Sequence, residues 1–234
     1  MSGSTVQSSP HRVPAYLEWV VAGCIAIGGI VLASVGSALF GFADRELLAE
    51  GIESGQITVG LVDRTLSEAE VLTFVTEVVN WTAIGLVVTG AGLLVFGLGF
   101  GVARRRARRR AESTAPTTTS RTYAVFGAVA TWVLSFLPFS PLLGGGVAAY
   151  LAGHTPERPA TVGALSGLVA MLPAFVISGF VTIGIASGLS RLPDGGIEPV
   201  TVAVLALGLV FVAGSSVALG ALGGFFGDRF VERD

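Results

Sequence analysis

Few residues in this chain combine into a pattern that could do chemistry. The 234 residues include two histidines, His11 and His154, and one cysteine, Cys24. A zinc site needs three or four ligands close together, and neither histidine has a second histidine or cysteine at ligand spacing. One cysteine cannot form an internal disulfide. The sequence therefore predicts no metal site, no cofactor and no internal disulfide.

Candidate nucleophiles also lack the partners that would activate them. Five hydroxyl residues in apolar segments have no histidine or lysine nearby in the sequence: Ser135, Ser140, Ser166, Ser178 and Thr182. Hydroxyls in such segments usually bond to the backbone one turn away. The alternating glycines at 97, 99 and 101 resemble part of a nucleotide-binding loop, but they follow an apolar segment and not a strand. We expect no enzyme activity.

The apolar segments themselves are the main signal. Hydrophobic residues make up 52% of the chain and charged residues 13%, and the mean hydropathy is +0.77. About 20 apolar residues cross the roughly 30 Å of hydrocarbon in a bilayer as a helix. Residues 16–42, 81–103, 161–189 and 200–226 meet this length. The sequence predicts an all-α, polytopic transmembrane helical bundle.

No Asp, Glu, Arg or His lies in the middle of these spans. Proton relays, voltage sensors and most ion-coupled carriers need such groups at membrane depth. The pattern therefore argues against a coupled transporter.

Charges between the spans predict the orientation. Acidic residues crowd the loop 44–80, and the next loop carries a cluster of arginines: Arg104, Arg105, Arg106, Arg108, Arg109 and Arg110. Arginine-rich loops stay in the cytoplasm, so the acidic loop is expected outside the cell membrane. The arginines can also bind anionic lipid headgroups. No aromatic residues interleave with them, which argues against a nucleic-acid partner.

The same features divide the chain. Residues 1–14 are Ser-rich and are expected to form a disordered cytoplasmic tail; residues 15–103 form a two-helix membrane module. Residues 104–121 are expected to be a basic, flexible cytoplasmic linker, and residues 122–234 a four-segment membrane module. Within the acidic loop, Thr65 and Glu68 match a capping box that would begin a helix.

Two topologies are open for residues 122–153, because Pro138 and Pro141 interrupt the helix there. A single kinked span gives five crossings. A hairpin whose second arm is short or re-entrant gives six segments, with both termini cytoplasmic. Charge favours the hairpin, since it places Arg158, Arg229 and Arg233 on the side of the arginine cluster.

Glycine is the residue that repeats. The chain has 33 glycines, about twice the average frequency of roughly 7%. Small residues recur at four-residue spacing, which places them on one helix face where another backbone can approach closely. The glycines predicted to pack helices are Gly29, Gly41, Gly97, Gly101, Gly145, Gly153, Gly163, Gly167, Gly184, Gly188, Gly220 and Gly224.

The C-terminal half carries a family resemblance. The strings are FSPLLGG at 139–145 running on to Tyr150 and Leu151, VGALSGL at 162–168, and LGALGG at 219–224 followed by Gly227. Over about residues 122–227 the chain resembles a haloarchaeal membrane-protein family known only as a domain of unknown function, family 5518. Ala149 departs from it, because a glycine is expected there. The resemblance implies a small bundle of about four helical segments and no assigned activity.

The leading functional hypothesis is a non-enzymatic structural or interaction protein that packs through its glycine faces. Its expected partners are the lipid bilayer and a second copy of the chain in a homo-oligomer. The alternative is a channel or facilitator for a small neutral solute, lined by the helix break and by Ser and Thr hydroxyls.

Overall fold

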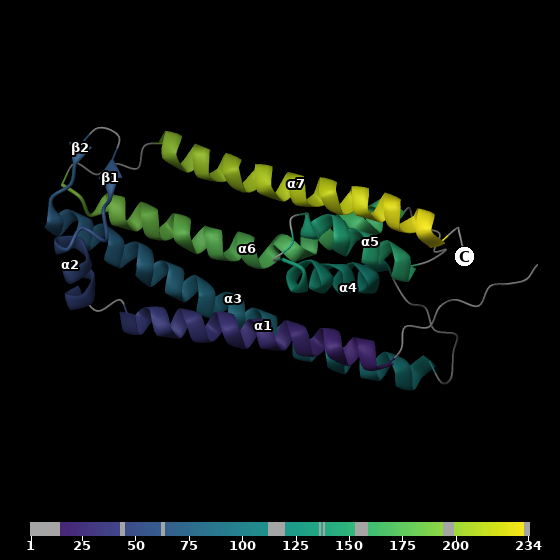
Figure 1. The fold of residues 1–234 in the computed structure, drawn as a ribbon. Coiled ribbons are helices and arrows are strands. Elements are labelled where there is room, and N and C mark those ends of the chain that lie inside the picture. Colours follow the sequence, from purple (N-terminus) through teal and green to yellow (C-terminus); the bar gives the residue numbers. More distant parts are fainter. Residues whose placement is uncertain are drawn as a thin grey trace, which may run out of the picture. The chain divides into compact units, whose positions relative to one another are not determined.

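The computed structural model describes residues 15–42, 45–61, 64–111, 120–135, 137, 139–152, 159–193 and 199–231. Within them the helices are α1 (Ala15–Phe42), α2 (Arg45–Glu53), α3 (Glu68–Ala111), α4 (Ser120–Val133), α5 (Ser140–Ala152), α6 (Pro159–Ser190) and α7 (Pro199–Val231). Two strands of two residues each, β1 (Gly60–Leu61) and β2 (Arg64–Thr65), pair antiparallel between α2 and α3 (Figure 1). The expected tail, residues 1–14, lies outside the described residues.

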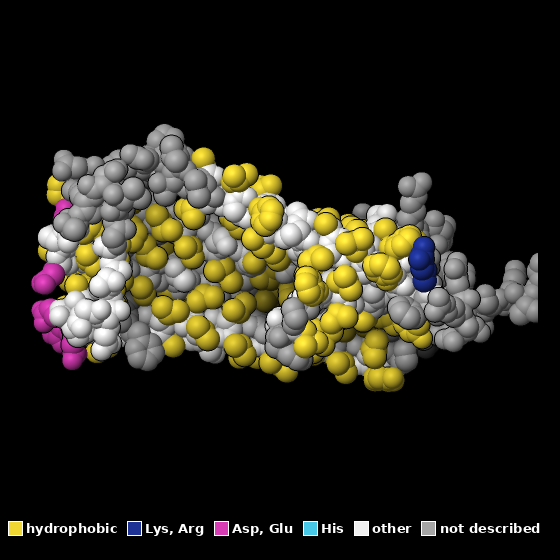
Figure 2. Space-filling view, turned by 45° about the horizontal axis from the view of Figure 1, so that its top comes forward, with side chains coloured by type: hydrophobic (Ala, Val, Ile, Leu, Met, Phe, Trp, Pro, Cys, Tyr) yellow, Lys and Arg dark blue, Asp and Glu magenta, His cyan; other side chains and the backbone are white. Residues whose placement is uncertain are grey.

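Four helices, α1, α3, α6 and α7, are long and apolar enough to cross a membrane by length and composition. Their outward side chains are hydrophobic, as Figure 2 shows over the exposed face of the helices. Phe211 of α7, for example, is 75% exposed. Such a surface is unfavourable in water and favourable among lipid chains. The helical fold and the four apolar spans agree with the sequence prediction, and they indicate a multi-pass membrane protein.

The described residues form two compact units. The first unit comprises Met1–Ala22, Phe100–Met171 and Ala213–Asp234, and the second comprises Gly23–Gly99 and Leu172–Val212. Each of the four long helices contributes residues to both units. Each unit therefore takes segments from both halves of the chain, whereas the predicted modules, 15–103 and 122–234, are each one continuous segment.

Helix α3 is longer than the sequence indicated. It continues through the arginine cluster to Ala111, eight residues beyond the expected end at 103, so the arginines are helical and do not begin a linker. Arginine is a good helix former, and basic side chains near the C-terminus of a helix interact favourably with its dipole. Residues 112–119 lie outside the described residues.

The segment after the arginines is a pair of short helices. Helix α4 has 14 residues and α5 has 13, and the chain turns between them. Phe139 adopts a left-handed backbone conformation with φ of 64°. Its carbonyl accepts hydrogen bonds from the amides of Leu142 (2.9 Å) and Leu143 (3.4 Å). The helix break expected at the prolines is present, and both arms are shorter than a membrane span.

The expected capping box at Thr65 and Glu68 is wrong. Helix α3 begins at Glu68, and the reciprocal bonds join Ser67 and Glu70: the Ser67 amide donates to Glu70 Oε2 (2.9 Å), and the Glu70 amide donates to Ser67 Oγ (3.4 Å). Thr65 instead pairs with Gly60 in the strand ladder. Both residue pairs fit the motif, and the pairing of β1 with β2 delays the start of the helix.

Removing the observed cap should loosen the first turn of α3. We expect Ser67→Ala to destabilise this turn by about 1 kcal/mol, which corresponds to roughly fivefold faster amide hydrogen exchange over residues 68–72. The measurement is exchange mass spectrometry in detergent micelles. Thr73→Ala is the control, because the Thr73 hydroxyl bonds only the Ala69 carbonyl within the helix. Equal exchange rates in the two variants would show that Ser67 is not the cap.

Candidate functional site

Three helices of the first unit meet at Gly220 of α7. A Cβ added to Gly145 of α5 or to Gly163 of α6 would collide with the Gly220 carbonyl oxygen. A Cβ added to Gly220 would collide with the Gly163 carbonyl oxygen and would lie 3.3 Å from the amide nitrogen of Gly167. The three backbones are therefore in direct contact, and only glycine fits at this junction.

The contact extends along α7 toward two neighbouring helices. Gly223 and Gly227 face α5. A Cβ added to Gly223 would collide with the Leu142 backbone, and one added to Gly227 would lie 2.6 Å from the Gly146 carbonyl oxygen. Gly224 faces the first turn of α6 at Pro159. Spacings of three, four and seven residues keep these glycines within one broad stripe of the helix. Helix α7 thus presents one face of glycine backbone to two neighbours.

Helix α4 joins this group through Gly127. An added Cβ at Gly127 would lie 2.7 Å from the Ala148 side chain of α5 and would collide with the Gly144 carbonyl oxygen. The Trp132 indole N–H donates to the Ala170 carbonyl of α6 (2.8 Å). A further interhelical bond runs from the Ser216 hydroxyl of α7 to the Gly167 carbonyl of α6 (3.2 Å). Polar side chains here bond the backbone of a neighbouring helix.

Ser166 of α6 is fully buried in the same region. A Cβ added to Gly127 would collide with its Oγ. Among the residues that the structure describes, this Oγ has no hydrogen-bond partner. Ser166 is therefore a polar group held against a glycine backbone.

In the second unit, α1 and α3 approach along a seam of small residues. A Cβ added to Gly29 would lie 2.7 Å from the Gly90 carbonyl oxygen, and one added to Gly90 would lie 2.9 Å from the Ala33 side chain. One added to Gly36 would lie 2.8 Å from the Ala83 carbonyl oxygen. The residue numbers rise on α1 as they fall on α3, so the helices are antiparallel.

A second seam of this unit joins α3 to α6. A Cβ added to Gly184 would lie 2.9 Å from Cβ of Trp81, and one added to Gly188 would lie 2.8 Å from the Phe74 ring. Phe180 packs against Gly85, and its ring centroid lies 6.3 Å from that of Trp81. Aromatic side chains of one helix therefore fill the space that glycines leave on the other.

An ion pair lies on the same seam. The Glu77 carboxylate is 2.9 Å from Nη1 of Arg191 and accepts a hydrogen bond from the Ser187 hydroxyl (2.9 Å). The Glu77 side chain is 12% exposed and that of Arg191 is 59% exposed. The carboxylate is thus largely enclosed by protein, and the guanidinium keeps much of its hydration. In the described part of the chain, no group of three His, Cys, Asp or Glu residues could hold a metal ion.

Arg104 differs from the rest of the arginine cluster. Its Nε lies 3.4 Å from Oε1 of the buried Glu18 on α1, and its guanidinium lies 5.9 Å from the centroid of the Phe100 ring. The Phe100 ring meets Phe126 of α4 edge to face at 6.4 Å. Arg104 therefore joins helices within the first unit.

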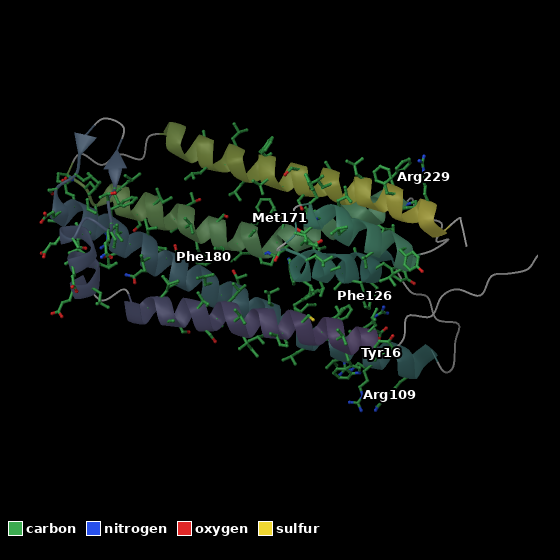
Figure 3. The ribbon with its side chains drawn as sticks, in the orientation of Figure 1. Tyr16, Arg109, Phe126, Met171, Phe180 and Arg229 are labelled. Atoms are coloured by element: carbon green, nitrogen blue, oxygen red, sulfur yellow. The ribbon has the colours of Figure 1, made fainter. Side chains whose placement is uncertain are left out.

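The other described arginines of the cluster face outward. The side chains of Arg105, Arg106 and Arg109 are exposed, and Figure 3 shows Arg109 pointing away from α3. The side chains of Arg108 and Arg110 lie outside the described residues. Arg229 of α7 is also exposed, and its guanidinium lies 4.5 Å from the centroid of the Phe225 ring. These outward arginines can meet lipid headgroups.

Most of the glycines singled out in the sequence lie at these contacts. Eight of them would clash with a neighbouring helix if they carried a Cβ: Gly29, Gly145, Gly163, Gly167, Gly184, Gly188, Gly220 and Gly224. Gly41 faces open space, Gly101 has only ordinary contacts at 3.7 Å or more, and Gly97 is buried. Gly153 lies outside the described residues.

Sequence reasoning missed several contact glycines: Gly36, Gly85, Gly90, Gly127, Gly144, Gly146, Gly223 and Gly227. It also missed both ion pairs. Gly223 and Gly227 have the four-residue spacing and could have been found. The others have no glycine four residues away, and the residues they contact lie on another helix.

The ion pair on the α3–α6 seam can be tested by a double-mutant cycle. We expect Arg191→Ala to cost about 1–3 kcal/mol of unfolding free energy, because it leaves the largely enclosed Glu77 charge with only Ser187. Glu77→Gln should cost under about 1 kcal/mol, since the exposed Arg191 rehydrates and Ser187 keeps an acceptor. The measurement is reversible unfolding in mixed micelles. A double variant no more stable than Arg191→Ala would contradict this account.

The junction at Gly220 predicts a large effect from one methyl group. We expect Gly220→Ala to destabilise the fold by about 1–3 kcal/mol, because the added Cβ meets backbone atoms that cannot move aside independently. Gly208→Ala is the matched control on the same helix, where an added Cβ meets nothing within 4 Å. It should be neutral or slightly stabilising. Similar unfolding curves for both variants would refute the backbone junction.

The comparisons with known proteins concern the half of the chain that holds this junction. No curated protein and no solved structure matches the chain. Residues 121–230, nearly all of α4 to α7, match the model of a family described as "Family of unknown function (DUF5518)". This match confirms the resemblance of the C-terminal half to that family.

Proposed function

We propose that the protein is a non-enzymatic structural or interaction protein of the cell membrane, held together by small-residue helix faces. The observation that carries the proposal is the junction at Gly220, where α5, α6 and α7 touch through backbone atoms. Lipid supplies no hydrophobic driving force between helices, so close van der Waals contact is a main source of helix association in a bilayer. A chain whose glycines lie at such contacts forms a rigid bundle.

The polar side chains of the first unit support this reading. Thr131, Trp132 and Ser216 each donate to a backbone carbonyl. Two of these bonds, from Trp132 and Ser216, link different helices. Groups of this kind stabilise a bundle, whereas catalysis requires polar groups that converge on a reacting atom.

Orientation is part of the proposal. The exposed Arg105, Arg106 and Arg109 would lie at the cytoplasmic surface and meet anionic lipid headgroups, each at about 1 kcal/mol. Both termini would then be cytoplasmic. The acidic side chains at one end of the molecule (Figure 2) would face the outside. Glu46 and Glu50 of α2 are exposed.

A homo-oligomer also belongs to the proposal. Several glycines remain open, among them Gly208 and Gly214 of α7, where an added Cβ would meet nothing within 4 Å. These positions leave space for the backbone of a second copy. The glycines with close contacts are used within the chain.

Two double variants of α7 separate the internal and the open glycines. We expect Gly220→Leu with Gly224→Leu to abolish the folded bundle, because both side chains would enter helix backbones. Gly208→Leu with Gly214→Leu should fold normally and lose the oligomer. Folded yield in detergent and blue-native gels of native membranes provide the measurements. Unchanged folding and assembly of the first variant would count against the proposal.

The second candidate is a facilitator for a small neutral solute. It is favoured by the helix break between α4 and α5 and by the buried hydroxyl of Ser166. Irregular backbone at membrane depth is tolerated in protein or beside a water-filled cavity.

A flux assay distinguishes the two candidates. Under the structural proposal, liposomes containing the protein should pass glycerol and urea at the same rate as empty liposomes, measured by light scattering after an osmotic step. Faster, saturable entry of either solute that Ser166→Leu removes would favour the facilitator.

A further inference from the structure

The hairpin of α4 and α5 is too short to cross a bilayer twice. Its arms have 14 and 13 residues, about 20 Å each at 1.5 Å per residue, against about 30 Å of hydrocarbon. The arms pack side by side through Gly127 of α4 and Gly144 and Ala148 of α5. The hairpin is therefore a compact pair of half-length helices.

The bond between Trp132 and Ala170 gives the depth of the hairpin tip. Trp132 lies one residue before the end of α4, and its indole bonds the Ala170 carbonyl. Ala170 lies eleven residues beyond the start of α6 at Pro159, which is about 17 Å along that helix. Charged Glu157 and Arg158 directly precede this start in the sequence. The tip therefore reaches about half the thickness of the hydrocarbon layer.

The large side chains around the tip are apolar and face outward, and the small Ser135 is exposed beside them. Phe139 is 66% exposed, and Val133, Leu137 and Leu143 are exposed as well. Large apolar groups gain free energy when they leave water. This composition suits contact with lipid chains and does not suit an aqueous channel wall.

The backbone of the tip has few amide hydrogens left to satisfy. The amides of Leu134, Ser135 and Leu137 donate to carbonyls three or four residues earlier. Those of Leu142 and Leu143 donate to the Phe139 carbonyl, and Pro138 and Pro141 have no amide hydrogen. Unpaired amides are the main obstacle to placing irregular backbone in lipid, and this turn removes most of them.

We propose that α4 and α5 form a re-entrant hairpin. It enters the membrane on the side of the arginine cluster, places Leu137 and Phe139 among the lipid chains near the middle of the bilayer, and returns to the same side. The chain then crosses the membrane four times, through α1, α3, α6 and α7. This proposal shares with the proposed function the location in the membrane and nothing else.

Single cysteines test the position of the tip. In a Cys24→Ser background, which leaves the chain without other cysteines, Phe139→Cys and Leu137→Cys report on the tip. Arg109→Cys and Glu46→Cys report on the two aqueous sides, and Val95→Cys, at a position 73% exposed on α3, reports on lipid. Each variant in sealed vesicles of either orientation is treated with a membrane-impermeant maleimide, before and after detergent.

We expect Arg109→Cys and Glu46→Cys to react from opposite sides, and the two tip cysteines, like Val95→Cys, to react from neither side until detergent is added. A tip cysteine that reacts from the Glu46 side would show that the segment crosses, and one that reacts from the Arg109 side would show that it lies in water. Either outcome overturns the re-entrant hairpin and leaves the structural proposal standing.

A nitroxide at Phe139→Cys tests the surroundings of the tip. In lipid it should show high accessibility to oxygen and low accessibility to a water-soluble nickel complex, as at Val95→Cys. Low accessibility to both, or spin–spin broadening between labels, would place protein or a second copy against the tip and would overturn the lipid contact. Phe139→Cys and Val95→Cys both replace exposed side chains, so the two variants are expected to fold.

Discussion

Contact between glycine backbones is the interaction on which the rest of this structure depends. Water drives soluble helices together, but helices that are already surrounded by lipid gain little from hiding apolar side chains. What remains is van der Waals contact, which falls off steeply with distance and is greatest where no side chain separates two backbones. At Gly220, one residue provides this contact to α5 and α6 at once. A single methyl group on Gly220 would push α6 away from α7, and one on Gly145 would push α5 away, which explains why the junction tolerates no larger residue.

Much of the fold could be predicted from the sequence, because the bilayer limits the choices. The apolar segments at 16–42 and 161–189 lie within α1 and α6, whose ends differ from the expected ones by one or two residues. Backbone in lipid must bond internally, so a long apolar segment has few alternatives to a helix. Prediction was weaker where water competes, as at the start of α3, where two residue pairs fit a capping box and the strand pairing of Thr65 decided between them.

The glycine faces were less predictable, and α1 shows why. Four residues turn a helix by about 400°, so a strict four-residue repeat drifts by about 40° at each step. From Gly29 to Gly41 this drift is about 120°, and Gly41 faces open space. Seven residues bring the helix back to within about 20° of its starting direction, and it is Gly36 that meets α3. A search for alternating steps of four and three would follow the contact face of a straight helix.

Ion pairs could not be found by spacing within one helix. Glu18 and Arg104 lie on α1 and α3, and Glu77 of α3 pairs with Arg191, which directly follows the end of α6. Each pair therefore depends on which helices are neighbours and in which register. The arginine cluster shows the limit clearly. Its members look equivalent in the sequence, yet Arg104 pairs with a buried carboxylate while Arg105, Arg106 and Arg109 face outward. Arg104 contributes to the packing of helices, whereas the side chains of Arg105, Arg106 and Arg109 are exposed.

Helix α5 shows how these contacts can fix the position of a helix that is too short for the bilayer alone to fix it. A helix that crosses the membrane is fixed by its two polar ends, but a helix of 13 residues lacks that constraint and must be held from its sides. Its three consecutive glycines turn by about 100° per residue, and they meet different neighbours. Gly144 contacts α4 at Thr131, Gly145 contacts α7 at Gly220, and Gly146 lies against Gly223 and Gly227. Helices α4 and α7 therefore hold α5 from two sides, which explains why a helix too short to span the bilayer carries one of the densest glycine runs in the chain.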